Sequence, residues 1–122
     1  MKKINVSEIS LDPKPIFLEL ETDSWDHTCS ILDLYCKRTT GPFIPFIENI
    51  TSCIQITVSS LSTFDENGEL ISRPSNSSIP FFRWQWDLII RVFDAVLEET
   101  KPDLQECYNE IIPKIKEVLE TA

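Results

Sequence analysis

The chain has 122 residues, 42% of them hydrophobic, and a formal net charge of −9 at pH 7. This length and composition fit one domain with a real core, and the negative charge argues against direct binding to nucleic acid or to an anionic membrane surface. A basic partner is favoured instead, because opposite charges speed encounter. We expect a single globular domain over residues 1–122, with residues 1–10 loosely ordered.

The termini and the cysteines indicate a compartment. No stretch resembles a secretory signal, and the apolar runs fall far short of the roughly 20 residues that span a bilayer. We therefore expect a cytoplasmic protein that does not enter membranes. Cys29, Cys36, Cys53 and Cys107 form no CxxC pair, and His27 is the only histidine. The usual zinc-finger ligand sets are thus absent, and we expect reduced, mostly buried cysteines.

The first predicted elements are a strand and a helix. In PIFLELE, residues 15–21, apolar residues alternate with a second face that holds Phe17, Glu19 and Glu21, which predicts a half-exposed strand. From residue 24 the spacing of the apolar residues changes from every second position to a helical spacing, and Gly41-Pro42 ends this helical pattern. The pattern predicts a helix over 24–38.

The middle of the chain predicts a hairpin. Residues 43–53 are ambiguous between helix and strand, although Pro45 suits a first helical turn. Alternation over 54–58 predicts a strand, with a bulge near Ser59-Ser60. Asn67-Gly68 then predicts a type I′ turn, from which residues 69–73 return antiparallel. The segment RPSNSSIP, which follows, is predicted to be a loop.

Clustered aromatic residues predict a central helix over 79–99. Within PFFRWQWDLIIRVF and the residues after it, the charged side chains fall on one stripe, and about 240° of the helix surface is apolar apart from one glutamine. Such a helix is best placed between a sheet and the C-terminal helix, although a homodimer or a partner could also cover one flank. Trp84 and Trp86 point in opposite directions, so at least one ring should lie at an edge of the core. The stripe consists of Arg83, Asp87, Arg91, Asp94 and Glu98.

The last element completes an α+β fold. Residues 103–120 carry one apolar stripe and predict an amphipathic helix, which Pro113 should kink or split near Asn109. The predicted fold is a small antiparallel sheet of about three strands, including a 53–73 hairpin. This sheet packs against the central helix (79–99), with the 24–38 and 103–120 helices at its flanks.

The sequence contains no recognisable catalytic or cofactor motif. Two glycines in the whole chain leave no room for a phosphate-binding loop. His27 and Cys29 point apart on a helix, so they do not form a nucleophile–base pair. Glu19 and Glu21 share a strand face, but no metal-ligand spacing accompanies them. We expect no enzyme activity, no cofactor and no metal.

The charge pattern instead suggests a protein-binding function. The interpretation that we favour is an immunity or inhibitor protein that neutralises a basic toxin or nuclease by direct binding. A DNA-mimicking anti-nuclease protein and a dimeric structural or adaptor protein, joined through the aromatic helix, are the alternatives. The candidate contact residues form an acidic region and an aromatic edge: Glu19, Glu21, Asp23, Asp26, Asp33, Arg83, Trp84 and Trp86.

Overall fold

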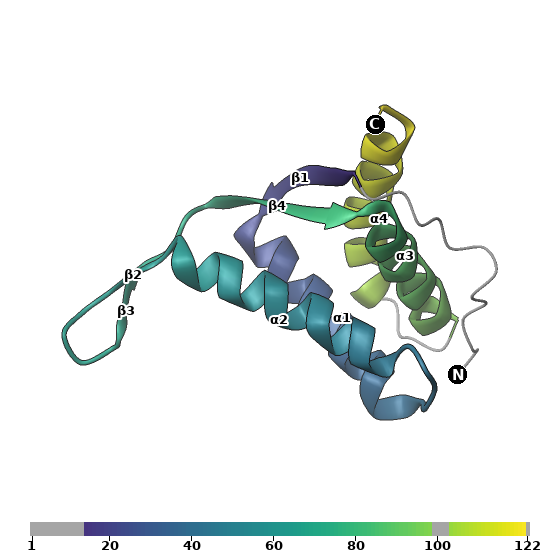
Figure 1. Cartoon of the computed structure of the whole chain (residues 1–122), viewed down its shortest axis with the longest axis horizontal. Coiled ribbons are helices and arrows are strands. Elements are labelled where there is room, and N and C mark those ends of the chain that lie inside the picture. Colours follow the sequence, from purple (N-terminus) through teal and green to yellow (C-terminus); the bar gives the residue numbers. More distant parts are fainter. Residues whose placement is uncertain (1–13, 99–102, 122) are drawn as a thin grey trace.

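A computed structural model describes residues 14–98 and 103–121, which form four helices and two antiparallel two-stranded sheets (Figure 1). The α+β class is thereby confirmed, but the strands form two separate sheets of two strands and not one sheet of about three, and the predicted 53–73 hairpin is limited to residues 63–72. The loose order expected for residues 1–10 lies outside the described residues. In chain order the elements are β1 (Pro15–Glu21), α1 (Thr22–Arg38), α2 (Ile44–Ser60), β2 (Thr63–Phe64), β3 (Leu70–Ser72), β4 (Asn76–Phe82), α3 (Arg83–Leu97) and α4 (Asp103–Thr121).

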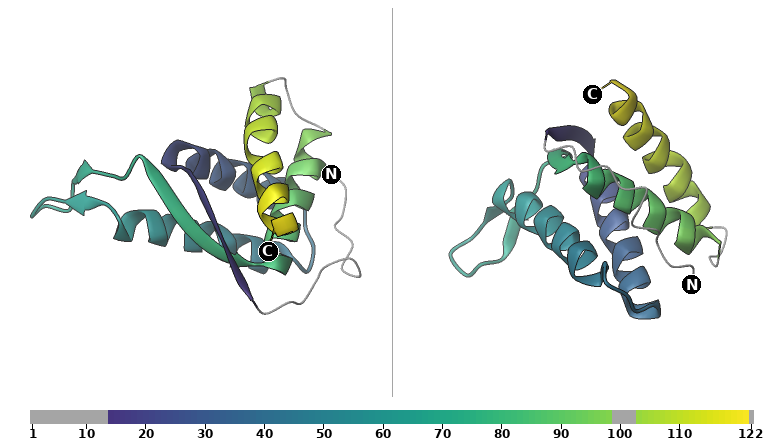
Figure 2. Two further views of the ribbon diagram at one scale, coloured as in Figure 1. Left: turned by 90° about the horizontal axis from the view of Figure 1, so that it is seen from above. Right: turned by 45° about the vertical axis from the view of Figure 1, so that its right-hand side comes forward.

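The helices form one layer and the longer sheet lies across it. Helices α2, α1, α3 and α4 lie side by side in that order (Figure 2). Strands β1 and β4 pair antiparallel along their full length, from Pro15↔Phe82 to Glu21↔Asn76. This two-stranded ribbon contacts all four helices. In both strands every second residue is buried against them, as a period of two requires.

Strand β4 and helix α3 correct the prediction of a helix over 79–99 and a loop before it. Residues 76–82 form a strand, because Ser77, Ile79 and Phe81 alternate inward and complete the ladder with β1. Pro80 is tolerated there because an edge strand can lack one backbone donor. The helix begins at Arg83. Gln85 Oε1 accepts a hydrogen bond of 2.8 Å from the Phe82 N–H and so helps to cap it.

Helix α2 corrects the prediction of a strand over 54–58 with a bulge after it. A single helix covers Ile44–Ser60, and Ile47, Ile50 and Ile54 form its buried stripe. Ile56, which the alternation placed beside Ile54, is 68% exposed. The ambiguous segment 43–53 is therefore mostly helix, and Pro45 lies in the first turn as predicted.

The turn between β2 and β3 is a hairpin turn of a different type from that predicted. A type I′ turn needs two residues with positive φ, but Gly68, at +80°, is the only such residue in the described part of the chain. The Gly68 N–H donates to the Asp65 carbonyl at 3.1 Å. Asp65 Oδ1 also accepts the N–H groups of Asn67 and Glu69, each at 2.9 Å. This is a turn completed by a left-handed glycine, with Asp65 as its organiser.

The two flanking helices lie where the sequence predicts them. Helix α1 begins two residues before the predicted 24–38, at Thr22, and ends at Arg38 as predicted. Helix α4 (Asp103–Thr121) matches the predicted 103–120, but it continues through the exposed Pro113 and is not split near Asn109. Helix α3 lies between α1 and α4, which is the central position expected for the aromatic helix (Figure 2).

Two tryptophans fasten the helical layer to the ribbon. Trp25 on α1 and Trp86 on α3 are fully buried, with ring centroids 6.1 Å apart. The Trp25 indole N–H donates to the Ser77 carbonyl at 2.8 Å, and the Trp86 indole N–H donates to the Ile16 carbonyl at 3.0 Å. Each side chain therefore combines a large buried ring with a satisfied donor.

Candidate protein-binding surface

The acidic residues singled out from the sequence divide into two groups. Asp23, Asp26 and Asp33 lie exposed on α1, and all three are in ion pairs. The guanidinium of Arg73 contacts the carboxylates of Asp23 and Asp26 at 2.5 and 2.7 Å, and Lys37 contacts Asp33 at 2.8 Å. These hydrogen-bonded carboxylates raise the pKa of both Arg73 and Lys37 above its ordinary value. Two cations therefore compensate two of the three negative charges within the chain.

Glu19 and Glu21 form the second group. Both lie on the outward side of β1 and are exposed. Among the described residues, no cation forms an ion pair with either carboxylate. Their negative charge is therefore available to a partner.

The outward side of the ribbon joins these carboxylates to exposed aromatic rings. Phe17 lies opposite Pro80, and Phe82 lies opposite Pro15, so the four side chains share one end of that side. Phe17 is 61% exposed and Phe82 is 39% exposed. We call the whole outward side the ribbon face; it consists of Pro15, Phe17, Glu19, Glu21, Asn76, Ser78, Pro80 and Phe82. It is apolar at one end and acidic at the other.

The aromatic edge predicted on α3 contains only one of its two tryptophans. Trp86 is fully buried and has no surface to offer a partner. Trp84 is half-buried and packs edge-to-face against Phe46 at a centroid distance of 5.8 Å, which confirms that one ring lies at the edge of the core. Arg83 is half-buried as well, and its guanidinium donates to the Leu119 carbonyl at 3.1 Å. Arg83 thus ties α3 to the end of α4.

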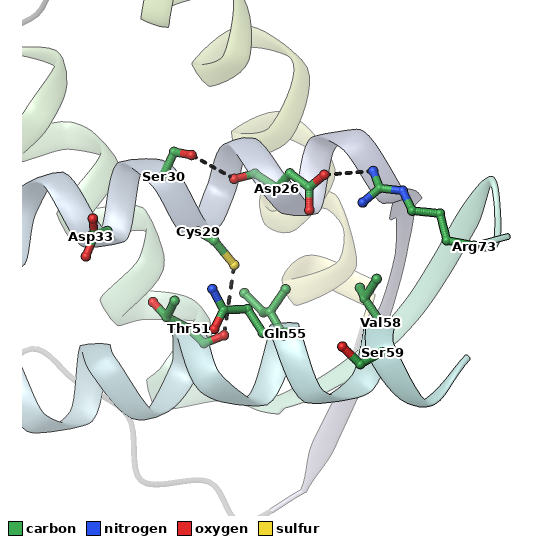
Figure 3. Close-up of a pocket in the computed structure, with 10 residues that line it drawn as sticks. Asp26, Cys29, Ser30, Asp33, Thr51, Gln55, Val58, Ser59 and Arg73 are labelled. Carbon is green, nitrogen blue, oxygen red and sulfur yellow. Dashed lines mark hydrogen bonds and ion pairs between the residues drawn. The ribbon is translucent and has the colours of Figure 1, made fainter. Parts of the chain in front are cut away.

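A groove of about 550 Å³ lies between α1 and α2 (Figure 3). Cys29 lies in it, and its thiol donates a long hydrogen bond to the Thr51 carbonyl at 3.9 Å. Burial, with the nearby charge of Asp26, raises the pKa of this thiol to about 12, so it stays protonated and poorly nucleophilic at neutral pH. The rest of the lining is mainly polar: Asp26, Ser30, Asp33, Ile54, Gln55, Val58, Ser59 and Arg73.

The described residues contain neither a candidate metal-binding cluster nor a candidate membrane span. Within residues 14–98 and 103–121, no group of three histidine, cysteine or carboxylate side chains is placed to hold a metal ion. His27 is exposed, in the first turns of α1. In the same ranges no helix combines the length and hydrophobicity needed to cross a membrane.

Two residues that shape this surface are not predictable from the sequence. The sequence predicts Arg73 at the start of a loop, whereas Arg73 contacts Asp23 and Asp26, which lie 50 and 47 positions away along the chain. The sequence predicts Phe82 in a helix, which gives no indication that it lies on the same side of the ribbon as Phe17. Phe17 itself was visible, since the period of two in PIFLELE puts it on the same side as Glu19 and Glu21.

Comparison with known proteins gives no relative. No protein-family model matches the chain, and neither a curated protein nor a solved structure resembles it closely enough to be counted as a match.

Proposed function

We propose that this chain is an acidic protein-binding module that inhibits a basic partner, such as a toxin or nuclease, and that the ribbon face makes the contact. The observation that carries the proposal is the combination on one face of two carboxylates, Glu19 and Glu21, that form no ion pair among the described residues, with two exposed aromatic rings, Phe17 and Phe82.

The two ends of the ribbon face would have different tasks. Aromatic rings are enriched in protein interfaces because they bury a large area at a small cost in side-chain entropy. Phe17 and Phe82 would therefore hold the bound partner. Carboxylates at the margin of an interface chiefly steer encounter and suppress partners of the wrong charge. Glu19 and Glu21 would supply that steering.

The ion pairs and the position of α3 favour an inhibitor over the two alternative functions. A DNA mimic must present carboxylates as substitutes for phosphates, but Asp23, Asp26 and Asp33 are paired with Arg73 and Lys37. A dimer through the aromatic helix is disfavoured because α3 is flanked by α1 and α4.

The test begins with capture of the partner on the full chain from the organism that makes it, followed by identification and purification. We expect a basic protein whose activity is lost when the full chain is added in equal amounts. The variant Glu19→Gln/Glu21→Gln should bind it on the order of tenfold more weakly, through slower association.

The matched control is Glu117→Gln/Glu120→Gln, which removes the same charge from an exposed part of α4. It should leave the affinity nearly unchanged. Equal effects of the two double variants would show that net charge, and not the ribbon face, determines binding, and an acidic or neutral partner would refute the proposal.

A further inference from the structure

Exposed apolar side chains gather at one end of the molecule, beyond the acidic end of the ribbon face. They lie at the C-terminal end of α2 and on the β2–β3 hairpin, which projects beyond the helical layer (Figure 1). Each side chain is about half exposed or more: Ile56 68%, Leu61 53%, Phe64 45%, Leu70 54% and Ile71 64%. We call residues 61–72 together with Ile56 the hairpin arm.

The hairpin arm carries a cluster of exposed apolar side chains across its two strands. Phe64 and Leu70 are cross-strand partners, so their side chains share one face, and Ile71 follows Leu70 at an irregularity in the register of the two strands. All three side chains are exposed. An isolated two-stranded hairpin is marginally stable in water, and clustered exposed apolar residues usually mark an interaction site. An apolar groove that covers these side chains is the complementary shape.

The arm is held in place at its base and at its tip. At the base, Arg73 is fixed by Asp23 and Asp26, and Thr22 Oγ1 donates to the Pro74 carbonyl at 2.6 Å. At the tip, Asp65 Oδ1 accepts two backbone N–H groups. Such preorganisation lowers the entropy lost on binding.

The charges on the arm indicate what covers it. Its turn carries Asp65, Glu66 and Glu69, all exposed, on a chain whose net charge is already −9. In a symmetric dimer formed through contact of the two arms, these like charges would lie close together, which costs binding energy. Lysine and arginine side chains around an apolar groove would pair with them instead.

We propose that the hairpin arm inserts into an apolar groove, rimmed by lysine or arginine, on the same basic partner that the ribbon face contacts. This inference rests on the proposed function and adds to it a second contact. The ribbon face steers encounter, and the arm slows dissociation.

Photo-crosslinking in the organism that makes the protein tests the placement of the arm. A photo-reactive amino acid replaces Ile71 in the full chain, and Ser52, exposed on α2, serves as the control position. We expect position 71 to crosslink to a basic protein, within an apolar segment flanked by lysine or arginine. Crosslinks to a second copy of the chain or to lipid, or none above the level at position 52, would overturn the proposal.

The partner that crosslinking identifies is then purified in its uncrosslinked form, and its binding kinetics provide the second test. Leu70→Ser/Ile71→Ser should raise the dissociation rate constant about tenfold or more, the effect of losing a hot-spot contact. The control Ser52→Ala, at an exposed position of α2 outside the arm, should not change it. Circular dichroism establishes that the helices remain folded in each variant. An unchanged dissociation rate for the double variant would overturn the inference.

The two proposals can fail separately. If Glu19→Gln/Glu21→Gln slows association but the arm variant changes nothing, the ribbon-face proposal stands and the arm inference falls. If the arm variant alone has an effect, the arm binds the partner and the ribbon face does not.

Discussion

Trp25 and Trp86 show how a single residue type can join two layers of this molecule. Each ring is fully buried, and each indole N–H reaches a backbone carbonyl of the ribbon. Phe81 packs edge-to-face on Trp86, with centroids 5.1 Å apart. Much of the aromatic stretch PFFRWQWDLIIRVF therefore serves the core, and Phe82 and Trp84 are the rings that it leaves at least partly accessible.

Replacing Trp86 should be far more costly than replacing Trp84. Trp86→Phe removes the donor to the Ile16 carbonyl and leaves a small cavity, and the lost hydrogen bond alone should cost about 1–3 kcal/mol of unfolding free energy. Trp84→Phe keeps an aromatic ring against Phe46 and should cost under about 1 kcal/mol. Urea denaturation measures both values. Equal losses would contradict the role given to the indole of Trp86.

Cys29 should resist alkylation in the folded chain. Burial and the charge of Asp26 raise the pKa of its thiol to about 12, so at pH 8 almost none of it is the reactive thiolate. Iodoacetamide labelling followed by peptide mass spectrometry should find Cys29 unmodified in native protein and modified after unfolding in urea. Rapid labelling of Cys29 in the native protein would contradict this.

At the scale of elements, helix α4 is attached to α3 near both of its ends. The Tyr108 hydroxyl donates to Asp94 Oδ1 at 2.6 Å, and its ring lies 6.5 Å from that of Phe93. At the other end, Arg83 donates to the Leu119 carbonyl. The charged stripe predicted on α3 thus supplies groups that hold α4.

The Tyr108–Asp94 contact predicts an unusual titration. The carboxylate favours the neutral phenol and raises the pKa of Tyr108 to about 12. Because the pKa is higher in the folded state, the stabilisation is complete below the unfolded value, about 10, and is lost as the pH rises through about 12. Asp94→Asn should lower the pKa of Tyr108 toward the ordinary value.

Absorbance at 295 nm follows the phenolate. Tyr108→Phe assigns the signal, since Tyr35 is the only other tyrosine and burial raises its pKa as well. A wild-type Tyr108 that titrates near 10, or one that ignores the Asp94 substitution, would show that the hydrogen bond does not form.

The elements also show what the sequence can and cannot predict. Strand β1 and helices α1 and α4 each have one buried stripe with a clear period, and all three were predicted within about two residues. Ile54, Ile56 and Val58 suit a strand as well as a helix, and packing against α1 decides for the helix. Strand β4 exists because β1 lies beside it, and that pairing joins residues about 55 to 67 positions apart.

The candidate surface was predictable to a similar degree. Phe17, Glu19 and Glu21 share a side by strand periodicity alone, so their exposure was expected. The compensation of Asp23 and Asp26 by Arg73 depends on a contact between distant segments. Local patterns carry no information about such a contact.

At the scale of the whole molecule, the ribbon face and the hairpin arm lie next to each other along the chain and in space. The acidic end of the ribbon is the pair Glu21↔Asn76, and residues 73–75 connect the arm to Asn76. Arg73 joins the base of the arm to Asp26 on α1 (Figure 3). It also contacts Asp23 in the first turn of α1, directly after β1. One partner can therefore contact both, first through charge and then through apolar burial.

The association rate constant with the purified partner, measured against ionic strength, tests the central claim most directly. We predict that the rate constant falls steeply from low salt to about 0.5 M salt, because screening there shortens the range of electrostatic attraction to a few ångströms. Glu19→Gln/Glu21→Gln should flatten this dependence, and Glu117→Gln/Glu120→Gln should not. An association rate indifferent to salt, or a slope unchanged by loss of Glu19 and Glu21, would contradict the account.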